Sequence, residues 1–215
     1  MKKILRFIII FALVATVMTT LASCNLFGSN SSEKNNQSQS DADICTKLNA
    51  LLSDIRYPVV LTSKTTENGY PFVGRYVVTE SGDTYSVEYS YEKLGTFEIT
   101  EDDRIVAPEG FRITYTGNMK VKNGVIIEKD GADANVSVQM LNAKNVSFSP
   151  SALKNVKTSG GTFSADITSL RDVTGWDLTT NGASVNIVYT DTQITKMTLA
   201  YSTQTYQTEL TYAFG

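Results

Sequence analysis

The 215-residue sequence contains no histidine and only two cysteines. Histidine is the commonest general base near neutral pH and the commonest zinc ligand, so its absence excludes Ser-His-Asp and Cys-His catalysis. Cys45 alone cannot form a thiolate metal site, and neither G-x-x-x-x-G-K-[ST] nor G-x-G-x-x-G occurs for phosphate binding. Carboxylate-dependent hydrolysis needs only two acids about 5 to 10 Å apart, and it stays open as a remote alternative.

Two groups of acids are candidates for such chemistry. Glu101, Asp102 and Asp103 form the densest cluster, but adjacent acids in "TEDDR" are more typical of a solvated turn. The loop "DGADAN" (130–135) could offer oxygens to calcium, yet it lacks the acid spacing and terminal Glu of an EF-hand loop, which favours a plain turn. We therefore expect a non-enzymatic protein with no cofactor and no metal.

The N-terminus has the layout of an export signal. Lys2, Lys3 and Arg6 precede an apolar run over 7–18, and small or polar residues follow. A membrane-spanning helix needs about 20 apolar residues, and this run stops short of that at Thr19. The pattern predicts a signal peptide that is removed after export.

The residues "LASC" (21–24) resemble the lipobox of bacterial lipoproteins. The resemblance implies that the Cys24 sulfur is alkylated by a diacylglyceryl group and that cleavage after Ser23 makes Cys24 the first mature residue. The alternative is an ordinary signal peptide with a cysteine by chance near the cut. Two acyl chains anchor a protein stably, whereas one chain binds a membrane only marginally. A lipid-anchored location on the extracytoplasmic face of the cell membrane is expected, and the outer membrane is an open alternative where the envelope has one.

The net charge of the mature chain favours membrane attachment through lipid rather than through a basic surface. Removal of residues 1–23 takes away three of 19 basic residues and none of 22 acidic ones, which leaves 16 basic residues and a net charge of −6. Such a chain lacks the clustered Lys and Arg of nucleic-acid binding and is mildly repelled by anionic lipid. Residues 24–40 are nearly all polar and are interpreted as a flexible tether.

Residues 41–215 are expected to form a single domain that opens with a helix. In "DADICTKLNALLSDIRYP" the apolar residues recur at helical spacing, Asp41 or Asp43 can cap the start, and Pro58 follows the end. Cys45 lies on the apolar side of this helix. With Cys24 acylated it has no disulfide partner, so a buried structural thiol is favoured over a reactive one.

After this helix the apolar period changes from 3.6 to 2, which predicts a mainly β domain. The Asn123-Gly124 turn in "MKVKNGVIIEK" supplies the positive φ angles of a two-residue hairpin. In "FSPSALKNVK" the alternation breaks, and Ser149 or Ser151 could cap a short second helix. Strands are expected at 57–66, 70–80, 84–93, 111–117, 119–123, 125–129, 134–140, 144–148, 162–168, 184–190, 194–203 and 206–214.

Lipidation at Cys24, an opening helix, a Tyr-rich meander and the closing pair "ITKMTLAYSTQTYQTELTYAF" are similar to the half-barrel superfamily of lipoprotein carriers and receptors (LolA/LolB-like). The resemblance implies a curved antiparallel sheet, open or half-barrel, whose concave apolar face accepts an acyl chain. An alternative is an envelope protein–protein binding or assembly module with a packed interior. A Tyr row lines a cavity or merely stabilises the sheet, and a sole Trp is a ligand platform or a core residue. The ligand-binding candidates are Tyr85, Tyr89, Trp176, Tyr206 and Tyr212.

Overall fold

The structure is a computed structural model, and it describes residues 33–67, 70–94 and 112–215. The chain divides into two units, residues 1–36 and residues 37–215. The second unit contains the whole sheet and the whole described core.

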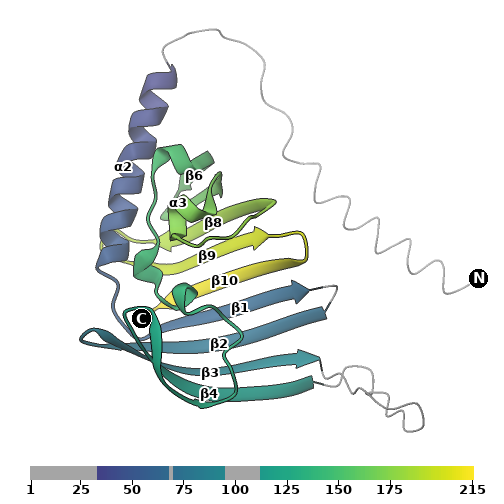
Figure 1. Cartoon of the computed structure of the whole chain (residues 1–215). Coiled ribbons are helices and arrows are strands. Elements are labelled where there is room, and N and C mark those ends of the chain that lie inside the picture. Colours follow the sequence, from purple (N-terminus) through teal and green to yellow (C-terminus); the bar gives the residue numbers. More distant parts are fainter. Residues whose placement is uncertain (1–32, 68–69, 95–111) are drawn as a thin grey trace, which may run out of the picture. The chain divides into compact units, whose positions relative to one another are not determined.

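In the described residues, ten antiparallel strands form one sheet, in the order β5-β4-β3-β2-β1-β10-β9-β8-β7-β6. Two meanders, β1 to β5 and β6 to β10, are joined where the first and last strands pair (Figure 1). No described strand pairs with the outer side of β5 or β6, so the described sheet does not close into a barrel. The predicted mainly β, open antiparallel architecture is confirmed. The strands are β1 (Val59–Glu67), β2 (Tyr70–Ser81), β3 (Thr84–Leu94), β4 (Arg112–Lys122), β5 (Val125–Gly131), β6 (Leu153–Ser159), β7 (Thr162–Ile167), β8 (Gly182–Tyr189), β9 (Ile194–Ser202) and β10 (Tyr206–Phe214).

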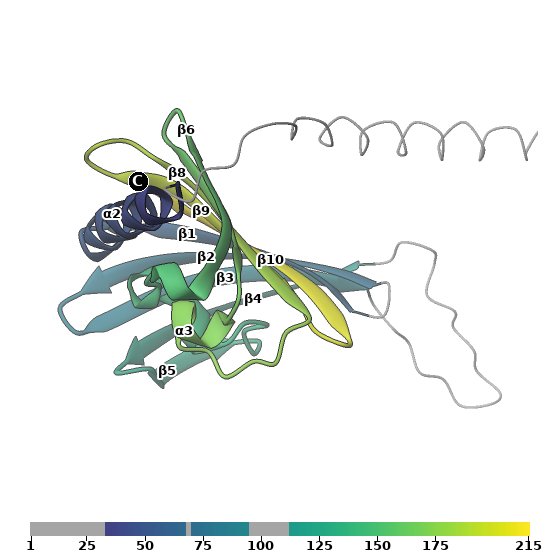
Figure 2. The same cartoon turned by 90° about the horizontal axis from the view of Figure 1, so that it is seen from above.

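One face of the sheet, here called the inner face, is covered by helix α2 (Glu33–Ser53) (Figure 2). Cys45, Leu48 and Leu52 are buried at helical spacing, so the apolar side of α2 meets the sheet as the sequence predicts. The helix begins at Glu33 rather than near Asp41. Glu, Lys and Gln are good helix formers, and extending a helix is far easier than nucleating one, so the turns before the buried residues also become helical.

Residues 132–152, here called the strap, connect β5 to β6 across the inner face. The strands predicted at 134–140 and 144–148 are wrong. The backbone forms three 3₁₀ turns instead, η1 (Val138–Leu141), η2 (Ala143–Asn145) and η3 (Pro150–Ala152). The alternating apolar residues of the strap, among them Leu141, Val146 and Phe148, are buried against the core rather than in a sheet ladder. Alternation alone does not reveal whether a segment has strand neighbours.

Three further differences concern element boundaries. The segments predicted at 111–117 and 119–123 form the single strand β4, while β6 was missed because "ALKNVK" follows the helical turn expected after Ser149. That turn is η3, and the short α-helix lies later, at α3 (Leu170–Thr174). The hairpin at Asn123-Gly124 is confirmed, with φ angles of 52° and 75°.

Two glycines let tyrosine rings lie across the inner face. Gly117 is opposite Tyr89, and a Cβ built on it would lie 2.6 Å from the Cζ atom of that ring. A Cβ on Gly74 would lie 2.7 Å from the ring of Tyr76. Atoms cannot approach so closely, so a side chain at either site would displace the ring. Gly117 thereby leaves room for the Tyr89 hydroxyl, which bonds to the strap.

Candidate binding surfaces

The inner face is the surface on which a curved sheet could hold a ligand, and tyrosine hydroxyls bind the strap there. Tyr89 donates a hydrogen bond to the backbone carbonyl of Ala132. Tyr212 donates to the carbonyl of Met140 over 2.7 Å. Burial raises the pKa of Tyr212 well above its usual range, so its hydroxyl remains a neutral donor at physiological pH. These hydroxyls satisfy carbonyls that the irregular strap cannot satisfy itself.

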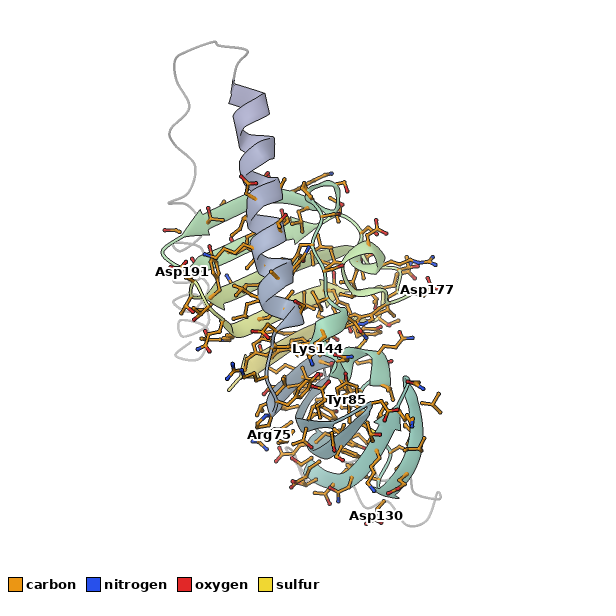
Figure 3. All side chains as sticks on the ribbon, turned by 90° about the vertical axis from the view of Figure 1, so that its left-hand side faces the viewer. Arg75, Tyr85, Asp130, Lys144, Asp177 and Asp191 are labelled. Atoms are coloured by element: carbon orange, nitrogen blue, oxygen red, sulfur yellow. The ribbon has the colours of Figure 1, made fainter. Side chains whose placement is uncertain are left out.

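Asn142 anchors the middle of the strap between two further tyrosines. Tyr57 donates to Asn142 Oδ1 at 3.3 Å, and Asn142 Nδ2 donates to the Tyr85 hydroxyl at 3.2 Å. Beside them the Lys144 ammonium is 2.8 Å from Glu80 and lies over the Tyr57 ring, 5.0 Å from its centroid. Figure 3 shows Tyr85 and Lys144 near the C-terminal end of α2. The strap is therefore held to the sheet by a mixed aromatic and ionic contact.

Asn49 of α2 holds the other end of the strap through two hydrogen bonds. Its Nδ2 donates to the carbonyl of Phe148 at 2.8 Å, and its Oδ1 accepts from the Phe148 N–H at 2.7 Å. The Phe148 ring is buried and packs against Phe163 with a centroid distance of 5.8 Å. One amide side chain thus gives the strap the two bonds that a neighbouring strand would provide.

The interior between strap, helix and sheet is packed with side chains. Buried strap residues complete the core that the sheet and α2 begin. In the part of the chain that the structure describes, every buried side-chain nitrogen and oxygen has a hydrogen-bond partner. A complete set of partners and continuous apolar contact are what a closed protein interior requires.

The five candidate ligand residues fall into two groups rather than one pocket. Tyr85, Tyr89 and Tyr212 bond to the strap, as described above. Trp176 is only 3% exposed and lies edge-on to Tyr201, which Tyr206 also meets edge-on. Burial raises the pKa of Tyr201 to about 12.

Sequence reasoning missed the two asparagines that hold the strap. Asn49 stands in the predicted helix and Asn142 in a predicted loop, and neither type of residue is unusual in such a place. Their partners are 99 and 57 residues away in the sequence, so no local pattern could reveal these contacts.

Three cavities open on the outer face of the sheet, which is the face opposite the inner one. A groove of about 630 Å³ crosses β2 to β5, and a smaller one of about 350 Å³ shares Glu88, Asn118 and Asp130 with it. A third, of about 780 Å³, lies over the strands around the β1–β10 pair. The side chains there are mostly hydroxyls, amides and charges, since the aromatic residues of these strands point inward. The first groove is lined mainly by Val77, Thr79, Ser86, Glu88, Asn118, Lys120, Glu128 and Asp130.

The acid and thiol candidates are placed as follows. Glu101, Asp102 and Asp103 lie outside the described residues, as does Cys24. In the 130–135 loop Asp133 pairs with Lys129, which lowers the pKa of the carboxyl, and Asn135 is exposed. Within residues 33–67, 70–94 and 112–215 no group of three His, Cys, Asp or Glu side chains could hold a metal.

Cys45 is a free, buried thiol. Burial, with a smaller contribution from Asp41, raises the pKa of this thiol, which keeps it protonated and weakly nucleophilic. None of the helices in the described part of the chain is long and apolar enough to cross a membrane. The sequence matches no protein-family model and is not similar to any curated protein.

Proposed function

We propose that the protein is a lipid-anchored, extracytoplasmic binding module of the cell envelope, without enzymatic activity, that contacts another envelope protein. Cys24 is its point of lipid attachment, and the sheet is the part that binds. The observation that carries this proposal is the strap, which occupies the inner face and leaves the outer face and the sheet edges as the accessible surfaces. A packed interior is what distinguishes a protein-binding module from a carrier with an apolar cavity.

The binding proposal is tested by photo-crosslinking in living cells. A photoreactive amino acid at Glu88, in the outer groove, is expected to give one discrete adduct that mass spectrometry assigns to an envelope protein. The same amino acid at Thr46, which is exposed on α2, is the matched control and is expected to give none. Equal adducts from both positions, or none from either across several growth conditions, would contradict the proposal.

The anchor is tested separately with Cys24→Ser. The native chain is expected to incorporate labelled palmitate and to sediment with membranes, whereas the variant incorporates no label and stays with its signal peptide uncleaved. Thioether attachment requires the sulfur, so serine cannot replace it. Cys45→Ser is the control and is expected to retain the label, because Cys45 is buried in the core. Label on the Cys24→Ser variant would refute lipidation at this residue.

A second candidate function is transport or reception of an acyl chain, as the resemblance to the LolA/LolB-like superfamily implies. One observation favours it: the inner face is rich in aromatic and aliphatic side chains, and an irregular segment rather than a helix or strand covers much of it. An acyl chain would then take the place of the strap. Mass spectrometry of lipid extracts from the purified protein is expected to find a stoichiometric amphiphile in that case, and an extract free of lipid counts against this function.

A further inference from the structure

The two outermost strands of the described sheet differ in their side chains. β5 and β6 are both seven residues long, and each leaves one side of its backbone without a described strand partner. An unpaired strand edge is a template for another strand. The β5 edge also begins with three apolar residues in a row, Val125, Ile126 and Ile127, which are 62%, 41% and 52% exposed. Such a run is unusual at an edge that meets only water.

Charges of opposite sign lie on the outer-face side of these two edges. Glu128 and Asp130 of β5 are opposite Lys120 and Asn118, which alternate with the buried residues of β4 and so point outward. On β6 the outward residues include Lys154 and Lys157. Neither lysine has an ion-pair partner among the residues that the structure describes. Figure 3 shows Asp130 at the β5 end of the sheet, and Figure 1 shows β6 at the other end.

The topology allows one sheet to continue into the next. All neighbouring strands are antiparallel and their number is ten, so the strands at the two ends run in opposite directions. When two copies lie with their outer faces on the same side, β6 of one copy and β5 of the next are therefore antiparallel. The charged pairs then meet on one face, because cross-strand neighbours in a sheet point the same way.

The spacing of the β5 acids matches that of the β7 residues that already face the two β6 lysines. Asp166 of β7 faces Lys154, and Ser164 of β7 faces Lys157. The two β7 residues are two positions apart, whereas the two lysines are three positions apart, because the register of β6 shifts between them. Glu128 and Asp130 have the same two-residue spacing on β5. They can face the two lysines from the other side of β6 in the way that the β7 residues do.

Symmetric pairings are disfavoured by the same charges. Two β5 edges would bring Glu128 and Asp130 against a second pair of acids, and two β6 edges would bring lysines together. Like charges directly opposite on neighbouring strands are destabilising. Only the pairing of β5 with β6 puts opposite charges together, and it repeats from copy to copy as a heterologous contact.

We propose that the protein associates with further copies of itself, edge to edge, through antiparallel pairing of β5 in one copy with β6 in the next. This inference rests on the proposed function as a binding module and names a second copy of the chain as a partner. Lys154 and Lys157 repel the same lysines of a second β6 edge, whereas Glu128 and Asp130 of a β5 edge attract them. The anchored copies share one membrane, which raises their local concentration and favours a contact of this modest size.

The test uses residues 37–215, which contain the whole described core, in sedimentation velocity over a concentration series. The native protein is expected to gain mass with concentration and to lose it in high salt. Reversal of one edge alone, by Lys154→Glu with Lys157→Glu or by Glu128→Lys with Asp130→Lys, is expected to leave monomers at every concentration. A mixture of the two reversed proteins is expected to associate again, because each then offers the edge that the other lacks.

The mixture separates loss of the contact from misfolding of a variant. A misfolded protein cannot restore specific association, so association in the mixture shows that both variants are folded. Circular dichroism of each variant checks the fold. Thr158→Glu, on β6 but on the inner side, is the charge control, and it should associate as the native protein does because the outer-face charges of both edges are unchanged. Association of the lysine-reversed protein by itself would show β5–β5 pairing and overturn the proposal. Monomers for the native protein at all concentrations would also overturn it. Crosslinking from Glu88 to a different envelope protein would then still support the proposed function.

Discussion

Replacement of Asn49 by alanine tests whether the strap depends on α2. The change removes the donor to the Phe148 carbonyl and the acceptor from its N–H, which are bonds of 2.8 and 2.7 Å. Phe148 is only 4% exposed, so water reaches these groups poorly. An unsatisfied buried backbone group costs about 1–3 kcal/mol, and alanine returns up to about 0.7 kcal/mol of helix propensity. We expect a loss of about 2–4 kcal/mol, which is a large fraction of the 5–15 kcal/mol typical of a domain.

The measurement is urea unfolding followed by circular dichroism, with the free energy of unfolding extrapolated to water. The slope against urea should not change, because the surface exposed on unfolding is the same. Thr46→Ala, on the exposed side of the same helix, is the control and should change stability by no more than about 0.5 kcal/mol. A loss below about 0.5 kcal/mol for Asn49→Ala would refute the argument that this side chain holds the strap.

Three further predictions follow from buried groups. The pKa of Tyr212 is raised in the folded state by burial, so the unfolded chain loses its phenol proton first. As pH rises above about 10, Tyr212 alone should contribute a fall in stability of up to about 1.4 kcal/mol per pH unit, which adds to that of the other buried tyrosines, and the slope should be smaller in Tyr212→Phe. Gly117→Ala should cost about 1–3 kcal/mol in urea unfolding because its Cβ meets the Tyr89 ring, whereas Gly182→Ala, with no atom within 4 Å, should be nearly neutral. Trp176 is the only tryptophan and is buried, so its fluorescence should be blue-shifted and resist iodide quenching until the domain unfolds; ready quenching of the native protein would contradict this placement.

Strand positions were predicted well where the two faces of the sheet differ. β3 and β10 alternate buried and exposed residues along their length, and this alternation is visible in the sequence because one face is in the core and the other in water. The hairpin between β4 and β5 was predicted from Asn123-Gly124, because few other residues tolerate both positive φ angles. Local chemistry decides such features.

The strap could not be predicted in the same way. Its apolar residues alternate as those of a strand do, and the sequence carries no sign that these residues pack against the core without a neighbouring strand to pair with. Its backbone polar groups are satisfied by Asn49, Tyr89 and Tyr212, which belong to three distant elements. Long-range contacts of this kind depend on the register of the whole sheet.

The sequence by itself determined the mainly β class, the amphipathic helix, the absence of histidine chemistry and the prediction of a lipid anchor at Cys24. Those follow from residue types and from periods of two and 3.6, which are properties of neighbours along the chain. Only the tertiary structure decided that the tyrosines of the inner face hold a strap, and that acids and lysines stand at opposite edges of one sheet. β5 and β6 are separated by a single connection in the sequence but by eight strands in the sheet. The reason is that the long-range pairing of β1 with β10 joins the two meanders, and no local pattern in the sequence reveals that pairing.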